Sequence, residues 1–276
     1  MTPSTTPPAT GLFLGRIPYV RLGSGPRRIV VVNGGQGFVR RFSAGSAARD
    51  IRQIMPLLPP DSTVVVLGYD ADPPAGYDMA RIVGDVATIM RTEIGPSTVM
   101  GISFGGFVAA RLAAEHPDLV DRLILLITAH RFSAEGRARV AGLIDDLERG
   151  DLYGMARKFA TLSRRAWVNL TVRLVLWLAR NKLAAKLNPP ATIIRSLSAA
   201  LNEDVAQGPG WLAAIRAPTL ILGGDADQFF DVAAMRETAT AIPAAKLELI
   251  AGETHMLPLE RPKPVAAAIT RFLTNS

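Results

Sequence analysis

The stretch that most constrains the fold is Val99-Met100-Gly101-Ile102-Ser103-Phe104-Gly105-Gly106. It joins a short apolar run to an Ala-rich segment, Phe107 to Glu115, that has helical character. A strand and a helix can meet at so sharp a turn only where the residues flanking the serine lack a Cβ. The pattern therefore predicts a serine whose hydroxyl stands clear at the end of a strand, as a nucleophile requires. An ordinary glycine-rich turn is the alternative interpretation of the same residues.

The composition bounds the class of protein. A chain of 276 residues with 49% hydrophobic residues fits one large α/β domain, or a core domain with an insertion. Cysteine is absent, which excludes disulfides and thiolate metal sites, and three histidines argue against a zinc cluster. We therefore expect neither a metal nor an organic cofactor, and a cytoplasmic location.

The first ten residues and the overall charge carry little functional information. Residues 1–10 are rich in Thr and Pro and lack the basic start and apolar run of a signal peptide, so we expect a flexible tail. The net charge is +7, but the basic residues are scattered along the chain without a dense run or interleaved aromatics. This pattern favours a solvated basic surface over a nucleic-acid site.

Apolar runs alternate with helical segments, as in a mostly parallel sheet that is covered on both faces. Glycines and a proline between the first two predicted strands favour a hairpin, so that the sheet would begin antiparallel. Helices are predicted at Met79–Glu93, Phe107–Glu115, Asp231–Thr240 and Pro264–Leu273. Strands are predicted at Arg16–Arg21, Ile29–Val32, Thr63–Leu67, Thr98–Met100, Leu123–Ile127, Thr219–Leu222 and Leu247–Ile250.

Residues 130–211 interrupt this alternation with helical patterns and no convincing strand. We predict that they form a helical lid inserted into a core domain made of residues 11–129 and 212–276. Within the lid, Trp167, Leu170, Leu174, Trp177 and Leu178 share one helical face.

Three interpretations of this apolar helix remain open. It packs against the core, it covers an acyl-binding pocket, or it meets a membrane surface with the help of Arg164, Arg165, Lys182 and Lys186. Asn169, Arg173 and Arg180 form a narrow polar stripe beside the apolar face, and the segment is too short and too charged to span a bilayer.

Several motifs in order give the chain its resemblance to a known family. They are Val32-Asn33-Gly34-Gly35 after an early strand, the Gly101–Gly106 stretch, Leu222-Gly223-Gly224-Asp225-Ala226-Asp227 after a late strand, and Gly252-Glu253-Thr254-His255 near the end. With them the chain resembles the α/β-hydrolase family from Ile17 to Leu273, and the lid is the least similar part. The resemblance implies an α/β-hydrolase fold.

The resemblance also implies a catalytic triad. A serine hydroxyl needs a base, and an imidazole, with an ordinary pKa near ~6.5, can accept and return its proton while a carboxylate orients it. In this family the chain order is serine, acid, histidine, which selects Ser103, Asp227 and His255.

Other residues compete for two of these roles. His130 precedes the acid and matches no family motif, and His116 is expected to lie at a helix end, so we favour His255 as the base. By the resemblance, the family spacing of a glycine, two residues and an aspartate selects Asp227 after Gly224 as the acid. Asp225 is expected to bind backbone groups in its turn. Glu253 is expected to face solvent.

The oxyanion of a tetrahedral intermediate needs donors fixed in advance. By similarity these are the backbone N–H groups of Phe104 and Gly35. The family usually has His-Gly just before the second donor, whereas this chain has Asn33, which raises the question of what supports the loop. A plain tight turn is the structural alternative for these glycines.

We therefore predict a serine hydrolase that cleaves a carboxylic ester, or a thioester, of a fairly hydrophobic small molecule through an acyl-serine. Acyl transfer, C–C bond hydrolysis and perhydrolysis use similar residues, and a ligand-binding protein with little turnover could keep the same triad. The expected partner is an apolar small-molecule substrate and not nucleic acid. The sequence leaves the oligomeric state open.

Overall fold

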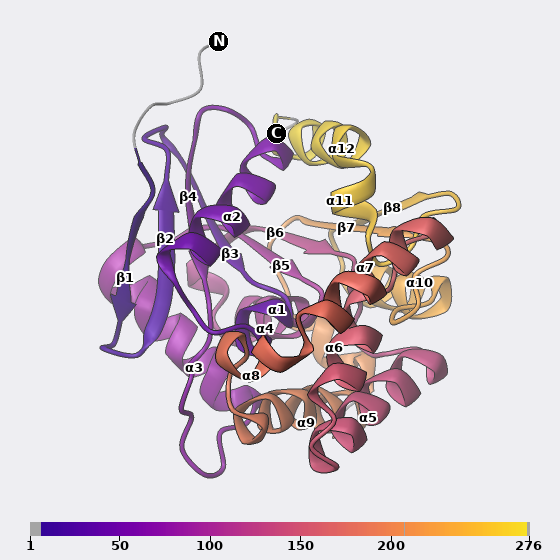
Figure 1. Cartoon of the computed structure of the whole chain (residues 1–276). Coiled ribbons are helices and arrows are strands. Elements are labelled where there is room, and N and C mark those ends of the chain that lie inside the picture. Colours follow the sequence, from indigo (N-terminus) through magenta and orange to yellow (C-terminus); the bar gives the residue numbers. More distant parts are fainter. Residues whose placement is uncertain (1–6, 207, 275–276) are drawn as a thin grey trace.

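The computed structural model describes residues 7–206 and 208–274. An eight-stranded sheet runs through its centre in the order β1-β2-β4-β3-β5-β6-β7-β8 (Figure 1). The strands are β1 Ala9–Phe13, β2 Ile17–Leu22, β3 Arg27–Val32, β4 Ser62–Leu67, β5 Ser97–Ile102, β6 Val120–Leu126, β7 Thr219–Gly224 and β8 Ala245–Ile250. Strand β2 is antiparallel to β1 and β4, and all other neighbours are parallel.

The helices that cover the sheet come from both halves of the predicted core. They are α1 Gln36–Val39, α2 Ala44–Ile54, α3 Met79–Ile89, α4 Phe104–Glu115, α10 Val232–Ala241, α11 Leu257–Glu260 and α12 Pro262–Thr274. The predicted helix to Glu93 continues past α3 as a π-turn, Met90–Ile94, and α4 begins three residues earlier than expected. The predicted α/β organisation is confirmed.

Two apolar layers hold the helices to the sheet. In β3, Ile29 and Val31 belong to the layer that contains residues of α2 and α12. Val30 and Val32 point the other way, into the layer with residues of α3, α4 and α10. Alternation along a strand sends neighbouring side chains to opposite faces, so an unbroken valine run serves both layers at once.

The expected hairpin between the first two predicted strands is wrong, because β4 lies between β2 and β3. The glycines of the connection serve a different purpose. A Cβ on Gly23 would lie 2.2 Å from the carbonyl oxygen of Ser62, and one on Gly25 would lie 1.9 Å from that of Asp61. The chain needs these glycines to cross closely over the start of β4.

The flexible tail predicted for residues 1–10 is longer than the structure allows. Strand β1 begins at Ala9 and pairs with β2, which places Ala9 and Thr10 in the sheet. A short Thr/Pro-rich segment carries no periodic signal, so its pairing with a later strand could not be read from it. Residues 1–6 lie outside the described residues.

Residues between β6 and β7 are helical. They form α5 Ala134–Glu148, α6 Leu152–Ala160, α7 Ala166–Leu178, α8 Leu183–Lys186 and α9 Pro190–Ala206. These helices gather on one side of the sheet (Figure 1), and α9 contacts α1, α3 and α4. The backbone N–H of Asn188 donates to the carbonyl of Val39, which ties this helical segment between β6 and β7, called the insertion below, to α1.

Candidate active site

Ser103 occupies the turn between β5 and α4 in a conformation that few residues other than glycine adopt. Its φ is 52° and its ψ is −120°. A Cβ on Gly101 would lie 2.4 Å from the carbonyl oxygen of Gly105, and one on Gly105 would lie 2.2 Å from that of Val32. Glycine is thus required at both positions, and the strained backbone projects the serine from the strand end.

A hydrogen-bonded chain leads away from this serine. Nε2 of His255 lies 2.9 Å from Oγ of Ser103, and Nδ1 of His255 lies 2.8 Å from Oδ2 of Asp227. Asp227 follows β7 and His255 follows the neighbouring strand β8, so the sheet brings both loops to the same edge. A neutral imidazole in this position accepts from the serine hydroxyl at Nε2 and donates from Nδ1 to the carboxylate.

Further contacts fix the carboxylate and the imidazole. Oδ1 of Asp227 accepts the backbone N–H groups of Phe229 at 2.8 Å and Phe230 at 3.1 Å, and the carboxylate is sealed from solvent. The rings of Phe229 and Phe230 lie 4.8 and 6.0 Å from that of His255. The aspartate therefore has little freedom to rotate, and the imidazole packs beside both phenylalanine rings.

The competing residues have other partners. Asp225 accepts the backbone N–H of Gly252 at 2.6 Å, so it braces a turn, although not within its own loop. His130 is buried, with Nδ1 2.9 Å from Oγ1 of Thr238, and burial lowers its pKa. His116 is the C-cap residue of α4, and its Nδ1 lies 3.0 Å from Nη2 of Arg91. Across residues 7–206 and 208–274, His255 is the histidine that hydrogen-bonds to Ser103.

The glycine loop after β3 lies directly beside the serine. A Cβ on Gly34 would come within 3.5 Å of Cβ of Ser103. Gly35 precedes the first helical residue of α1, and Phe104 is the first of α4, so both positions are at helix starts, where backbone N–H groups have no partner inside the helix. The two predicted oxyanion donors thus lie at the starts of α1 and α4, next to Ser103.

Asn33 supports this loop in place of the usual histidine. Its Oδ1 accepts the backbone N–H of Gly34 at 2.9 Å and Nε2 of Gln36 at 3.1 Å. The phenol of Tyr69 donates to the carbonyl of Asn33, and burial raises the pKa of that phenol, so it stays a donor. The departure from the family pattern therefore leaves the loop held by side-chain hydrogen bonds.

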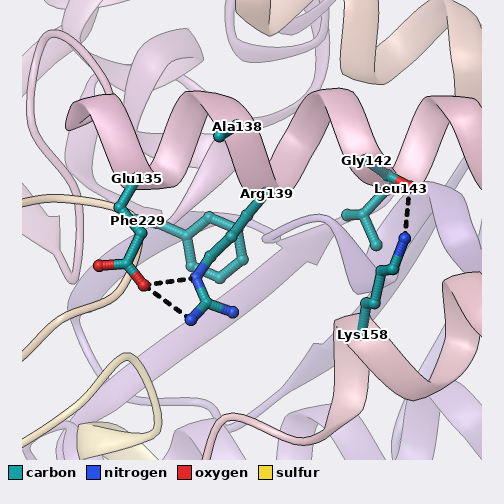
Figure 2. Close-up of a pocket in the computed structure, with 7 residues that line it drawn as sticks. All are labelled: Glu135, Ala138, Arg139, Gly142, Leu143, Lys158 and Phe229. Atoms are coloured by element: carbon teal, nitrogen blue, oxygen red, sulfur yellow. Dashed lines mark hydrogen bonds and ion pairs between the residues drawn. The ribbon is translucent and has the colours of Figure 1, made fainter.

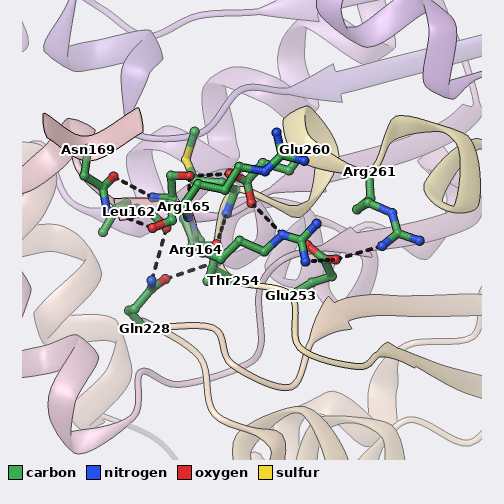
Figure 3. Close-up of polar contacts among 12 residues, drawn as sticks. Leu162, Arg164, Arg165, Asn169, Gln228, Glu253, Thr254, Glu260 and Arg261 are labelled. Carbon is green, nitrogen blue, oxygen red and sulfur yellow. Dashed lines mark hydrogen bonds and ion pairs between the residues drawn. The ribbon is translucent and has the colours of Figure 1, made fainter. Parts of the chain in front are cut away.

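The expectation that Glu253 faces solvent is wrong. Its carboxylate is 1% exposed, and Oε1 lies 3.2 Å from Nη1 of Arg261 and 3.6 Å from Nη1 of Arg164 (Figure 3). Arg164 belongs to the segment between α6 and α7, and it also approaches Glu260. A buried carboxylate needs such partners, and sequence distance hid them because Arg164 is far from Glu253 along the chain.

Gln228 is a site residue that the sequence analysis missed. Its Oε1 accepts the backbone N–H of His255 at 3.2 Å, and its Nε2 donates to the carbonyl of Leu162 at 3.1 Å (Figure 3). One amide thus joins the histidine loop to the helical insertion. No motif signals this role, since it depends on where the insertion packs.

A cavity of about 380 Å³ opens between α5 and α6. Phe229 is among its lining residues. Arg139 donates to the carboxylate of Glu135, and Lys158 donates to the carbonyl of Gly142 (Figure 2). Ser103 is not among the lining residues. Phe229 lines the cavity, and its ring centroid lies 4.8 Å from that of His255. Among the described residues, no cluster of acids and histidines could hold a metal ion.

Comparisons with known proteins agree with this architecture. Residues 4–262 match the model of a family described as alpha/beta hydrolase fold. The Mycobacterium tuberculosis protein named "Putative non-heme bromoperoxidase BpoC" is 29% identical over 212 residues, covering 72% of this chain and 77% of that one.

Solved structures show the same fold. MGS-M2, an α/β hydrolase enzyme from a Medee basin deep-sea metagenome library, superposes with a TM-score of 0.78 at 17% identity, covering 97% of this chain and 98% of that one. The enol-lactonase of Burkholderia xenovorans LB400 gives 0.77 at 20% identity, covering 97% and 100%. At such low identity these likenesses establish the fold alone.

Proposed function

The chain belongs to the α/β-hydrolase family, and from this premise we propose that it is a serine hydrolase that cleaves a carboxylic ester or thioester through an acyl-Ser103 intermediate. The observation that carries the proposal is the continuous chain from Ser103 through His255 to Asp227 at the strained turn. A merely structural serine would need neither the strain nor a buried carboxylate behind its imidazole partner.

The geometry supports the following sequence of steps. Oγ of Ser103 attacks the carbonyl carbon while its proton passes to Nε2 of His255, and the carbonyl oxygen becomes an oxyanion. Nε2 then returns the proton to the departing alkoxide or thiolate. Water repeats the cycle on the acyl-serine: its proton goes to Nε2, its oxygen bonds to the acyl carbon, and Oγ of Ser103 leaves with that proton.

The backbone supplies the oxyanion donors that we assign. The N–H of Gly34 is engaged by Oδ1 of Asn33, which leaves the N–H of Gly35 to act together with that of Phe104. Asp227 holds the imidazole in the tautomer that can accept at Nε2 and stabilises it once protonated. This division requires no metal or organic cofactor.

Proteins with the same fold are named for several reactions. The enol-lactonase is named for a lactone, which is a cyclic ester. A bromoperoxidase-like relative keeps perhydrolysis as the second candidate, in which hydrogen peroxide replaces water in the deacylation step. Acyl transfer would use an alcohol there, and C–C hydrolysis would expel a carbanion equivalent instead of an alkoxide.

A panel of p-nitrophenyl esters from acetate to dodecanoate tests the proposal. We expect wild-type turnover, with a preference for a medium or long acyl chain, and none above background for folded Ser103→Ala. Added hydrogen peroxide or alcohol then reports which acceptor competes with water. Turnover by Ser103→Ala at the wild-type rate would refute ester hydrolysis by this site. So would a wild-type protein that binds the esters but forms no acyl-serine.

A further inference from the structure

Helix α7 presents an unusual apolar surface. None of its 13 residues is buried, and six large apolar side chains are between 48% and 68% exposed. We call these six side chains the α7 patch: Trp167, Leu170, Leu174, Val175, Trp177 and Leu178. Single exposed apolar residues are common on protein surfaces, but six on one short helix form a continuous patch, which marks a contact surface.

The opposite side of α7 fixes this orientation. Val168, Val172 and Leu176 are half-buried, and Leu176 packs against the core cluster. At the start of the helix, Oδ1 of Asn169 accepts the N–H of Ser163 at 3.0 Å and its Nδ2 donates to the carbonyl of Ser163 at 2.8 Å. The helix is thus docked by its other side, and the interpretation in which the apolar side packs on the core is wrong for this face.

The charged residues of α7 and of the sequence on either side of it are all basic. The segment from Leu152 to Asn202 contains nine Lys and Arg residues and no Asp or Glu. Arg165, Arg173, Lys182 and Lys186 are exposed, and in the part of the chain that the structure describes no ion pair involves them. Arg164 differs, because it faces Glu253 and Glu260.

We propose that the α7 patch docks onto an anionic lipid surface, with α7 lying in the plane of the interface. Apolar side chains with flanking unpaired cations match the acyl boundary and the negatively charged headgroups above it. A second copy of the chain would meet the same cations and repel it, so charge favours the lipid. This inference is independent of the proposed catalytic function.

The geometry fits a helix that lies on a membrane rather than one that crosses it. Thirteen residues make a helix of about 20 Å, shorter than the roughly 30 Å hydrocarbon core. No helix among the described residues is both long and apolar enough to cross a membrane. Tryptophans occur near both ends of the patch, as is common for residues at a membrane interface. The guanidinium of Arg180 lies 4.5 Å from the ring of Trp177, which adds a cation beside the patch.

Vesicle binding tests the inference directly. The full chain is mixed with sonicated vesicles of phosphatidylcholine alone, or of phosphatidylcholine in which roughly a third of the lipid is phosphatidylglycerol. Binding is measured by flotation and by tryptophan fluorescence. Trp167 and Trp177 lie in the patch, so their emission should shift to the blue on binding. We expect binding to the anionic vesicles that weakens as salt is raised, because headgroup attraction is screened.

Matched variants separate the two parts of the surface. Replacing Leu170, Leu174 and Leu178 with Gln should weaken partitioning at least about tenfold. Replacing Arg173, Lys182 and Lys186 with Gln should weaken it on the order of a hundredfold at low salt, from about 1 kcal/mol per cation. Two control variants change exposed residues of the same kinds outside the insertion, and both should bind like wild type. The apolar control replaces Leu12, Leu14 and Phe42 with Gln, and the basic control replaces Arg21, Arg52 and Arg81 with Gln.

Three results would overturn the inference. They are equal binding to neutral and anionic vesicles, equal binding by the α7 variants and their controls, and absence of binding with concentration-dependent dimerisation that the leucine variant abolishes. The last would assign the patch to a second copy. Far-UV circular dichroism of every variant shows that each is folded.

Discussion

Oδ2 of Asp227 lies 2.8 Å from Nδ1 of His255, while its other oxygen accepts two backbone N–H groups from the residues that follow. The carboxylate is therefore oriented by the chain itself before it meets the imidazole. Asp225, two residues earlier, is turned instead toward the N–H of Gly252. Two acids in one loop thus have separate tasks, and this separation can be tested.

Asp227→Asn should lower kcat by about 10⁴, the loss seen when a serine protease triad loses its carboxylate and the wrong imidazole tautomer is held. Asp225→Asn is the matched control, and it should lose less than about tenfold, because its hydrogen bond serves a turn. Steady-state kinetics with one p-nitrophenyl ester compares the two. A larger loss in folded Asp225→Asn would reassign the acid.

Asn33→Ala should affect the rate more than substrate binding. Removal of Oδ1 frees the N–H of Gly34 and loosens the loop that carries the donor at Gly35. Loss of a direct oxyanion donor costs about 10²–10³ in kcat, so loss of its support should cost about tenfold. Gln36→Ala, which removes one donor to Asn33 and leaves the loop bond intact, should keep kcat within about twofold. An Asn33→Ala effect confined to KM would contradict this role.

The ion pairs of Glu253 should respond asymmetrically to mutation. Its carboxylate is buried, whereas Arg164 and Arg261 are partly exposed and can turn to solvent. Replacing both arginines with Ala leaves the buried carboxylate of Glu253 without a cationic partner, and it should destabilise the protein by about 3–5 kcal/mol. Glu253→Gln should cost less, about 1 kcal/mol, since each arginine can be hydrated. Urea unfolding gives both values, and equal costs would show that Glu253 is not held by these pairs.

His130 should make stability depend on pH. Burial lowers its pKa in the folded state, while the nearby carboxylate of Glu237 raises it and Arg131 lowers it further. Above the ordinary histidine pKa of ~6.5, both states are neutral and His130 contributes no dependence. As the pH falls below that value, the unfolded chain binds the proton first, so the folded state loses relative stability.

His130→Asn keeps a donor for Thr238 and removes the titration. We expect the fall in urea midpoint between pH 6.5 and pH 5 to be smaller in this variant than in wild type, with fluorophosphonate labelling of Ser103 retained. An unchanged slope would mean that His130 is not the group responsible.

The sequence predicts the fold where a residue's role is local. The glycines around Ser103 are needed by a turn of a few residues, and the buried valine runs of β3 and β4 show on their own that both faces of the sheet are covered. Strand order is different: the Gly23–Pro26 connection looks like a hairpin, and only the later pairing of β4 with β2 shows that it is a crossing.

The same limit applies at the site. His255 could be chosen from chain order and Asp227 from its spacing after Gly224, because the family resemblance supplies both the order and the spacing. The burial of Glu253 and the bridge made by Gln228 depend on Leu162 and Arg164, which lie on the insertion. Their partners are set by how that insertion packs, and no periodicity or motif in either segment encodes it.

The most direct test of the account is where an acyl or phosphonyl group becomes attached. The wild-type chain and Ser103→Ala are each incubated with a fluorophosphonate and with a slowly hydrolysed long-chain p-nitrophenyl ester, quenched in acid, and mapped by peptide mass spectrometry. We expect a single adduct in wild type, on the peptide that contains Ser103, and none in the folded variant. An adduct on another residue, or turnover of the ester by Ser103→Ala at the wild-type rate, would contradict it.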